Sequence, residues 1–109
     1  MNKLSKLQKH ILLMAYRRGR VSNADILIEL YGFKPVSYGN LRFDREQIGM
    51  KRYLGASASV ATSLTRLRHR CLLRRGPLNR GHLLTPQGVE AAKQLYSNTI
   101  KKESRVGNG

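Results

Sequence analysis

The side chains best suited to hydrogen bonds and ionic contacts lie between Ala56 and Arg75. This stretch is rich in hydroxyl and guanidinium groups and contains no acid. At 100° per residue its apolar members fall on one helical stripe that is predicted to face a core: Val60, Leu64, Leu67 and Cys71. Its polar members fall on the other side: Ser59, Thr62, Ser63, Arg66, His69 and Arg70. A helix with two chemically distinct faces is therefore expected over 57–70.

Short hydroxyl side chains are a poor choice for a helix face that needs only to be stable, because they compete for backbone hydrogen bonds. They suit a helix that approaches another surface closely, as a helix in the major groove of DNA does. We therefore predict that four residues contact base edges: Ser59, Thr62, Ser63 and Arg66. Arg66, at the centre of the predicted face, is the natural bidentate donor to guanine. The alternative is an ordinary solvated polar face.

A basic hairpin is predicted directly after this helix. The segment LLRRGPLNRGHLL indicates two short strands, 72–75 and 82–84, joined by a turn rich in Gly, Pro and Asn. We expect the hairpin region 74–84 to lie along a DNA backbone or in the adjacent minor groove. The residues predicted to approach the backbone come from this hairpin and its surroundings: Tyr53, Arg68, His69, Arg70, Arg74, Arg75, Asn79 and Arg80.

The charge of the chain agrees with a polyanionic partner. Lys and Arg number 21 against six Asp and Glu, which gives +15 at pH 7, and no acid occurs between Glu46 and Glu90. Such a basic stretch favours nucleic acid, because each phosphate that it neutralises releases condensed counterions. One cysteine, three scattered histidines and the dispersed acids form neither a metal-site nor a catalytic pattern. No metal, cofactor or enzymatic activity is predicted.

Two helices are predicted ahead of the polar helix. Apolar residues recur at helical spacing over 4–18, where Gly19 ends the first helix. Ser22, with an acid three residues further on, has the capping-box pattern for a second helix over 23–31, and Gly32 follows it.

Residues 33–55 separate the second helix from the polar helix and are treated as an insertion. The Gly39-Asn40 pair marks a turn. Asp44 is predicted to cap a short helix over 45–54, which Gly49 weakens.

A last helix follows the hairpin. Thr85 is its predicted N-cap and Pro86 its first residue, where a missing N–H costs nothing. Its predicted inner stripe is Val89, Ala92, Tyr96 and Ile100. The charged, Gly-rich segment 101–109 is predicted to be a disordered basic tail, which leaves 1–100 as one domain. The expected fold class is mainly α with a small β-hairpin (α+β).

Two short motifs carry a resemblance to a known family. Arg66-Leu67 followed by Leu72-Leu73, and Leu84-Thr85 followed by Gly88, are similar to the end of the recognition helix and the start of the next helix in MarR-like winged-helix transcription regulators. The resemblance covers 57–96 and implies a winged helix-turn-helix: a three-helix core, a hairpin wing and a C-terminal helix. Sequence-specific binding of double-stranded DNA is the function it implies.

The chain departs from that family at two places. Cys71 stands where the family has Gly, a residue that relieves a left-handed backbone. The link 33–55 is also longer than usual, which leaves open which segment packs across the polar helix.

Other partners compete with double-stranded DNA. The same fold and charge would suit an RNA-binding component of a ribonucleoprotein, and a third hypothesis is a protein–protein adaptor. Leu13, Ala91 and Leu95 lie off the predicted core stripes and are candidate contacts of a homodimer, with scattered exposed apolar residues as the alternative. The single cysteine and the lack of a long apolar run predict a cytoplasmic protein without a membrane segment; no effector ligand can be inferred.

Overall fold

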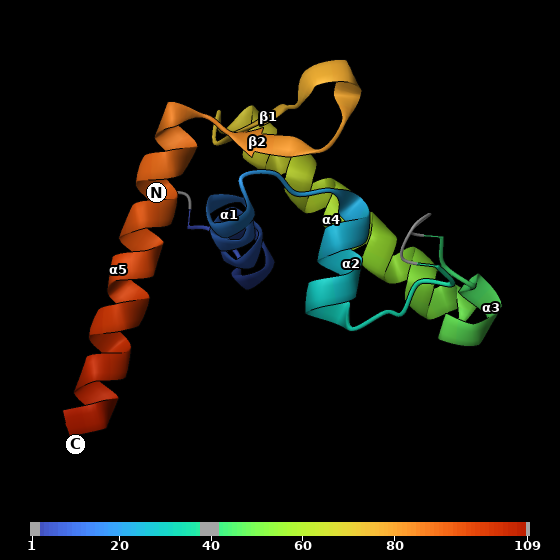
Figure 1. Ribbon diagram of the computed structural model, residues 1–109, viewed down its shortest axis with the longest axis horizontal. Coiled ribbons are helices and arrows are strands. Elements are labelled where there is room, and N and C mark those ends of the chain that lie inside the picture. The colour runs from blue at the N-terminus through green and yellow to red at the C-terminus, as the bar shows by residue number, and fades with distance from the viewer. Residues whose placement is uncertain (1–2, 38–41, 109) are drawn as a thin grey trace.

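The fold is mainly helical, with a two-stranded antiparallel hairpin after α4 and a C-terminal helix after the hairpin (Figure 1). The computed structural model describes the backbone of residues 3–37 and 42–108, and their side chains except at 79 and 99–108. Its elements follow in chain order: α1 Lys6–Arg18, α2 Asn23–Tyr31, α3 Arg45–Ile48, α4 Met50–His69, β1 Leu73–Arg75, a 3-10 turn Pro77–Asn79, β2 His82–Leu84 and α5 Pro86–Asn108. This order is consistent with a winged-helix topology.

Capping residues set the ends of α1 and α2, as predicted for both ends of α2 and for the C-terminal end of α1. Ser5 and Gln8 form a reciprocal capping box at the start of α1, so the helix begins at residue 6 rather than 4. Ser22 and Asp25 do the same for α2, whose predicted bounds are confirmed. Both helices end at a glycine in the left-handed conformation, where a side chain would be strained.

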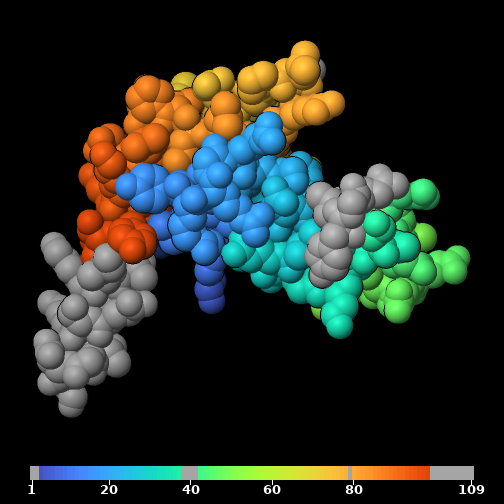
Figure 2. All heavy atoms as spheres, viewed as in Figure 1, coloured from blue at the N-terminus to red at the C-terminus, as the bar shows by residue number. Residues whose placement is uncertain are grey.

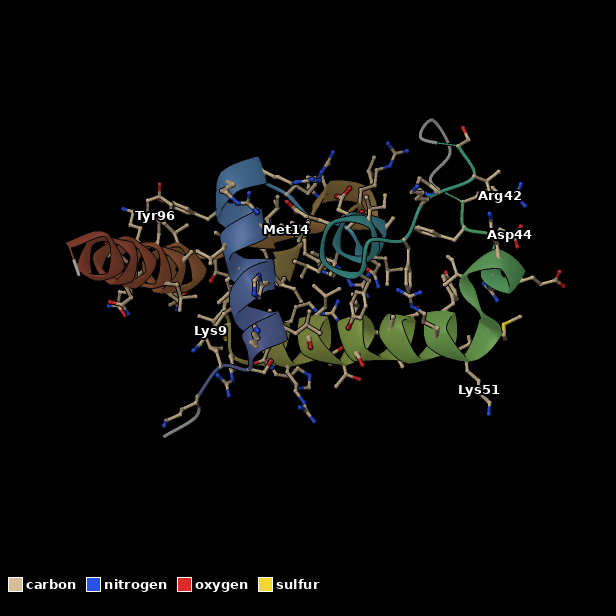
Figure 3. All side chains as sticks on the ribbon, turned by 90° about the horizontal axis from the view of Figure 1, so that it is seen from below. Lys9, Met14, Arg42, Asp44, Lys51 and Tyr96 are labelled. Atoms are coloured by element: carbon tan, nitrogen blue, oxygen red, sulfur yellow. The ribbon has the colours of Figure 1, made fainter. Side chains whose placement is uncertain are left out.

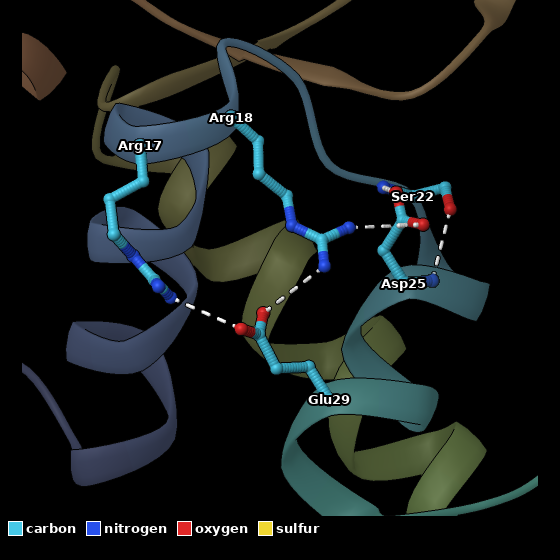
Figure 4. A network of polar contacts seen from close by, with 5 residues as sticks. All are labelled: Arg17, Arg18, Ser22, Asp25 and Glu29. Carbon is cyan, nitrogen blue, oxygen red and sulfur yellow. Dashed lines mark hydrogen bonds and ion pairs between the residues drawn. The ribbon is translucent and has the colours of Figure 1, made fainter.

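Ion pairs join the end of α1 to α2 (Figure 4). The guanidinium of Arg17 lies 3.3 Å from the carboxylate of Glu29, and that of Arg18 lies 3.5 Å from Asp25 and 3.7 Å from Glu29. These side chains are partly exposed, so each pair adds little stability. Their main effect is to neutralise the two acids of α2.

The insertion contains a shorter helix than predicted. Asp44 caps α3 as expected, but α3 ends at Ile48 because Gly49 has a φ of 104°, outside the helical region. Residues 50–54 instead form the start of α4, which covers Met50–His69 rather than 57–70. Residues 37 and 42 pair as an isolated bridge, and the predicted Gly39-Asn40 turn lies outside the described residues.

An aromatic cluster anchors the insertion to α4. The rings of Phe33, Phe43 and Tyr53 lie 6.0–6.5 Å apart, centroid to centroid. The guanidinium of Arg45 lies 5.1 Å from the Tyr53 ring centre, and that of Arg52 lies 5.1 Å from the Phe33 ring centre. The long link is thus packed against the first turns of α4.

The hydrophobic core lies between α1, α2 and α4. Side chains from all three helices are fully or almost fully buried there: Ile11, Leu12, Met14, Ile26, Val60, Leu64 and Leu67. The predicted stripe of α4 is confirmed for these last three residues, but Cys71 is exposed. It lies beyond the end of α4 with a φ of 61°, so it does not continue the stripe.

The hairpin is tied to the segment between α1 and α2. Leu73 pairs with Leu84, and Arg75 with His82, so the first strand begins one residue later than predicted. Val21 forms a further antiparallel bridge to His82 through two backbone hydrogen bonds of 3.1 and 2.7 Å. The strands of the hairpin are therefore fixed to the body of the protein, whereas the turn at its tip projects beyond the helical body (Figure 2).

The helix α5 packs mainly against α1. Ala92 is fully buried, and Ala91 and Leu95 are partly buried against the core, not off it as predicted. Tyr96, expected on the inner stripe, is 49% exposed, with its ring centre 6.4 Å from that of Tyr16. Leu13 is half-buried, and the homodimer stays a prediction.

The backbone of α5 continues as a helix to Asn108, past residue 101 at which the tail was expected to begin. In Figure 1 its C-terminal part extends beyond α1.

Candidate nucleic-acid interface

One side of α4 is exposed along the length of the helix. At 100° per residue, four exposed residues lie within an arc of about 40° opposite Val60: Lys51, Ala58, Thr62 and His69. Figure 3 shows Lys51 pointing away from α2. We call these four residues the α4 face. It combines two small side chains, one of which carries a hydroxyl, with a lysine and a histidine, and it contains no acid.

The residues predicted to contact bases separate into three groups. Thr62 lies on the α4 face, and Ser59 and Arg66 are exposed toward one edge of it. Ser63 is only 8% exposed, so its predicted outward position is wrong. Ser63 follows Val60 by three residues and precedes Leu67 by four, which places it on the buried stripe.

Three residues of this side of α4 were not predicted, because the sequence pattern centred the polar face on Arg66. Two of them are exposed and the third is half-exposed: Lys51, Ala58 and Thr65. The signal that could have found them was Ala56, which is buried and widens the core stripe toward Ser63. With that wider stripe, the opposite side of the wheel falls on Ala58 and Thr62 rather than on Arg66.

Tyr53 was predicted to approach phosphates, but the structure places it in the aromatic cluster with Phe33 and Phe43. It lies about 20° from Val60 on the wheel, on the core side of α4. Tyr53 is therefore not brought together with the α4 face.

Arg68 lies on the last turn of α4, and its charge acts on His82 of the hairpin. Its guanidinium donates to the hydroxyl of Thr65 at 3.4 Å. The ring of His82 is buried in β2, and its Nδ1 atom has no hydrogen-bond partner among the described residues. Burial, and then the charges of Arg68 and Arg75, lower the pKa of His82. Cations from α4 and β1 thus act on the same buried ring.

The hairpin carries the other predicted cations on its outside. Arg74, Arg75 and Arg80 are exposed, while the side chain of Asn79 lies outside the described part of the chain. At the tip, Leu78 is 86% exposed in a left-handed conformation.

Arg66, His69 and Arg70 come together at the C-terminal end of α4, where His69 ends the α4 face. They line a groove between the last turns of α4 and the N-terminal segment, with Lys3 on its far side. This grouping of the predicted residues was not foreseen.

The salt bridges of the described residues lie away from α4 and the hairpin. Within the described ranges, the salt bridges join α1 to α2 and Glu90 to Lys93, and none involves α4 or the hairpin. In the same part of the chain, no three His, Cys, Asp or Glu side chains gather to hold a metal ion. The arrangement suits binding of an anionic surface.

Comparison with protein-family models, curated proteins and solved structures finds no match to this chain. None of the described helices has both the length and the apolar character needed to cross a bilayer.

Proposed function

We propose that this chain is a winged helix-turn-helix protein that binds double-stranded DNA, with α4 in the major groove and the hairpin against the adjacent backbone or minor groove. The single observation that carries the proposal is the α4 face, a surface of small and basic side chains with no acid, on the helix that leads into a hairpin with three exposed arginines. The similarity of its motifs to MarR-like regulators supports a role in transcription.

The dimensions of α4 suit this placement. Its 20 residues are about 30 Å long, and the major groove of B-DNA, about 12 Å wide, admits one helix. The small side chains of Ala58 and Thr62 let the backbone of α4 approach base edges closely. Lys51 and His69, at the two ends of the α4 face, would lie where the strand backbones cross the helix.

The two small residues of the α4 face offer different contacts to bases. The hydroxyl of Thr62 can donate or accept a hydrogen bond at a base edge. Ala58 has only a methyl group, which suits apolar contact with the C5-methyl group of thymine. Ser59 and Arg66 lie at one edge of the face, so they would approach the wall of the groove rather than its floor.

The hairpin would supply contacts that do not depend on sequence. Arg74, Arg75 and Arg80 are exposed on it, and the charge of Arg68 on α4 acts on its buried His82. Arginine binds phosphate through parallel hydrogen bonds, which position a protein on DNA without reading bases. Base readout on α4 and backbone contacts on the hairpin would then be separate tasks.

Selection of bound duplexes from a random pool tests the proposal. We expect an enriched motif, and we expect Thr62→Ala to change the preferred base at one position of it. A palindrome with half-sites about one turn apart would indicate a homodimer, and a single half-site a monomer. If neither the unaltered chain nor Thr62→Ala enriches any sequence motif, α4 reads no bases.

A further inference from the structure

The groove between the N-terminal segment and α4 has the character of an anion site. Lys3 and Gln8 line one side of it, and Arg66, His69 and Arg70 line the other. No acid is among its lining residues. Residues 66, 69 and 70 have the i, i+3, i+4 spacing that places side chains on one helix face, so three hydrogen-bond donors face the same opening.

One hydrogen bond joins the two sides of this groove, and a pair of hydrogen bonds fixes its N-terminal side. The guanidinium Nη2 of Arg70 donates to the carbonyl oxygen of Lys3 at 3.4 Å, which joins α4 to the N-terminal segment. The Ser5 hydroxyl accepts from the Gln8 amide at 3.1 Å, and the Gln8 side-chain oxygen accepts from the Ser5 amide at 3.0 Å. Gln8 is only 4% exposed. One side of the groove is therefore fixed by the capping box of α1, and Arg70 joins the other side to it.

Cations that lie close together repel one another, so a group of them without an acid is unfavourable unless an anion binds between them. The guanidinium of Arg66 offers a planar pair of donors, and Lys3 offers a compact charge across the groove. This combination matches a tetrahedral phosphate with several acceptor oxygens.

We propose that this groove is a phosphate-binding site, and that in the DNA complex it holds one backbone phosphate at the edge of the major groove. The contact with a DNA phosphate rests on the proposed function, whereas the phosphate-binding site itself does not. Arg66 and Arg70 lie about 60° and 100° around α4 from His69. They therefore stand beside the α4 face, where a sugar-phosphate wall runs when a helix lies in the groove. In this proposal Arg66 binds a phosphate, and not the guanine that the sequence pattern predicted as its partner.

The three histidines lie in different surroundings, so NMR of their imidazole rings can test the phosphate site without DNA. His69 lines the groove, His10 lies on α1 away from it and His82 is buried in β2. The full chain would be titrated with inorganic phosphate, and with chloride at equal ionic strength, while the imidazole resonances are followed by NMR. We expect a saturable shift of the His69 resonances with phosphate only. Equal shifts of His69 and His10, or equal shifts with both salts, would overturn the phosphate site.

Matched variants test the same site. Lys3→Ala should weaken the phosphate response at His69 at least several-fold, and Lys34→Ala, which removes an exposed cation outside the groove, should leave it unchanged. Thermal unfolding of both variants checks that the fold is retained. Equal responses from the two variants would contradict the proposal.

DNA binding gives a separate measure. The slope of log K against log salt should become shallower by about 0.9 in Lys3→Ala, the value for one lost phosphate contact, and should not change in Lys34→Ala. A saturable His69 response in a protein that does not bind DNA would overturn the proposed function but support a site for free phosphate. DNA binding with equal slopes in both variants, and no specific His69 response, would overturn the site and leave the proposed function standing.

Discussion

The hydroxyl of Thr85 donates a hydrogen bond to the carbonyl oxygen of Cys71, and so ties the start of α5 to the end of α4 across the hairpin. The same hydroxyl accepts from the amide of Gly88 at 3.0 Å, and the amide of Thr85 donates to the carbonyl oxygen of Leu72 at 3.1 Å. These contacts give a physical reason for the Leu-Thr-x-x-Gly motif. They also require Cys71 to turn sharply, with a φ of 61°.

Replacing Cys71 by Gly is expected to stabilise the protein. An exposed non-glycine residue in the left-handed region is strained, and glycine removes that strain at a gain of about 1 kcal/mol in the free energy of unfolding. Urea denaturation measures the change. Cys71→Ala serves as the control, because alanine keeps the strain and should give no such gain. A glycine variant less stable than the alanine variant would contradict this explanation of the turn.

Gly88→Ala is expected to be strongly destabilising. A Cβ atom at Gly88 would overlap the carbonyl oxygen of Leu72, so α5 would have to move away from the turn. We expect a loss of about 2–3 kcal/mol, as for overpacked core positions. Gly55→Ala is the matched control, because no atom lies within 4 Å and alanine favours the helix by up to about 1 kcal/mol. A stable Gly88→Ala variant would show that α5 does not make this close approach.

His82 is expected to make stability fall in mild acid. Burial and the charges of Arg68 and Arg75 lower its pKa below 6.5, so the unfolded chain takes up a proton before the folded chain does. The stabilising effect of the neutral ring is thus fully present above about pH 6.5 and is lost progressively as the pH falls toward the folded pKa. Denaturation curves at pH 7 and pH 5 measure this loss, and His82→Leu should reduce it. An unchanged pH dependence in the variant would rule out His82 as its source.

Local signals predicted much of the fold. The capping box of Ser22 and the terminal glycines Gly19 and Gly32 were predicted because they act within a few residues of themselves, whereas the cap at Ser5 was missed. The hairpin was also predicted, since its turn residues are local. The boundary between α3 and α4 was misplaced, because the unusual φ of Gly49 depends on how the insertion packs.

The candidate site was predicted less completely, because its arrangement depends on tertiary contacts. The position of Ser63 depends on how wide a stripe of α4 the neighbouring helices cover. Tyr53 enters a cluster with residues of the insertion. The approach of Lys3 to Arg70 joins residues 67 positions apart, and no sequence period could reveal it.

Base readout and backbone contact are expected to separate in two variants. Thr62→Ala should cost about 1 kcal/mol at one base pair, the net value of a hydrogen bond, and should leave binding to unrelated sequences nearly unchanged. Arg80→Ala should weaken binding to all sequences alike and make the salt slope shallower by about 1. Competition binding between a selected duplex and a scrambled one measures both effects. If both variants lose affinity for the two duplexes equally, the division between α4 and the hairpin is wrong.

The most direct measurement compares the affinity of the full chain for duplex DNA, duplex RNA and single-stranded DNA of equal length at one fixed salt concentration. The major groove of A-form RNA is deep and narrow and would not admit α4. We predict that duplex DNA binds most tightly and that its affinity falls steeply with salt. Equal or tighter binding of duplex RNA, or no binding of any nucleic acid at about 50–100 mM salt, would contradict the placement of α4 in the major groove.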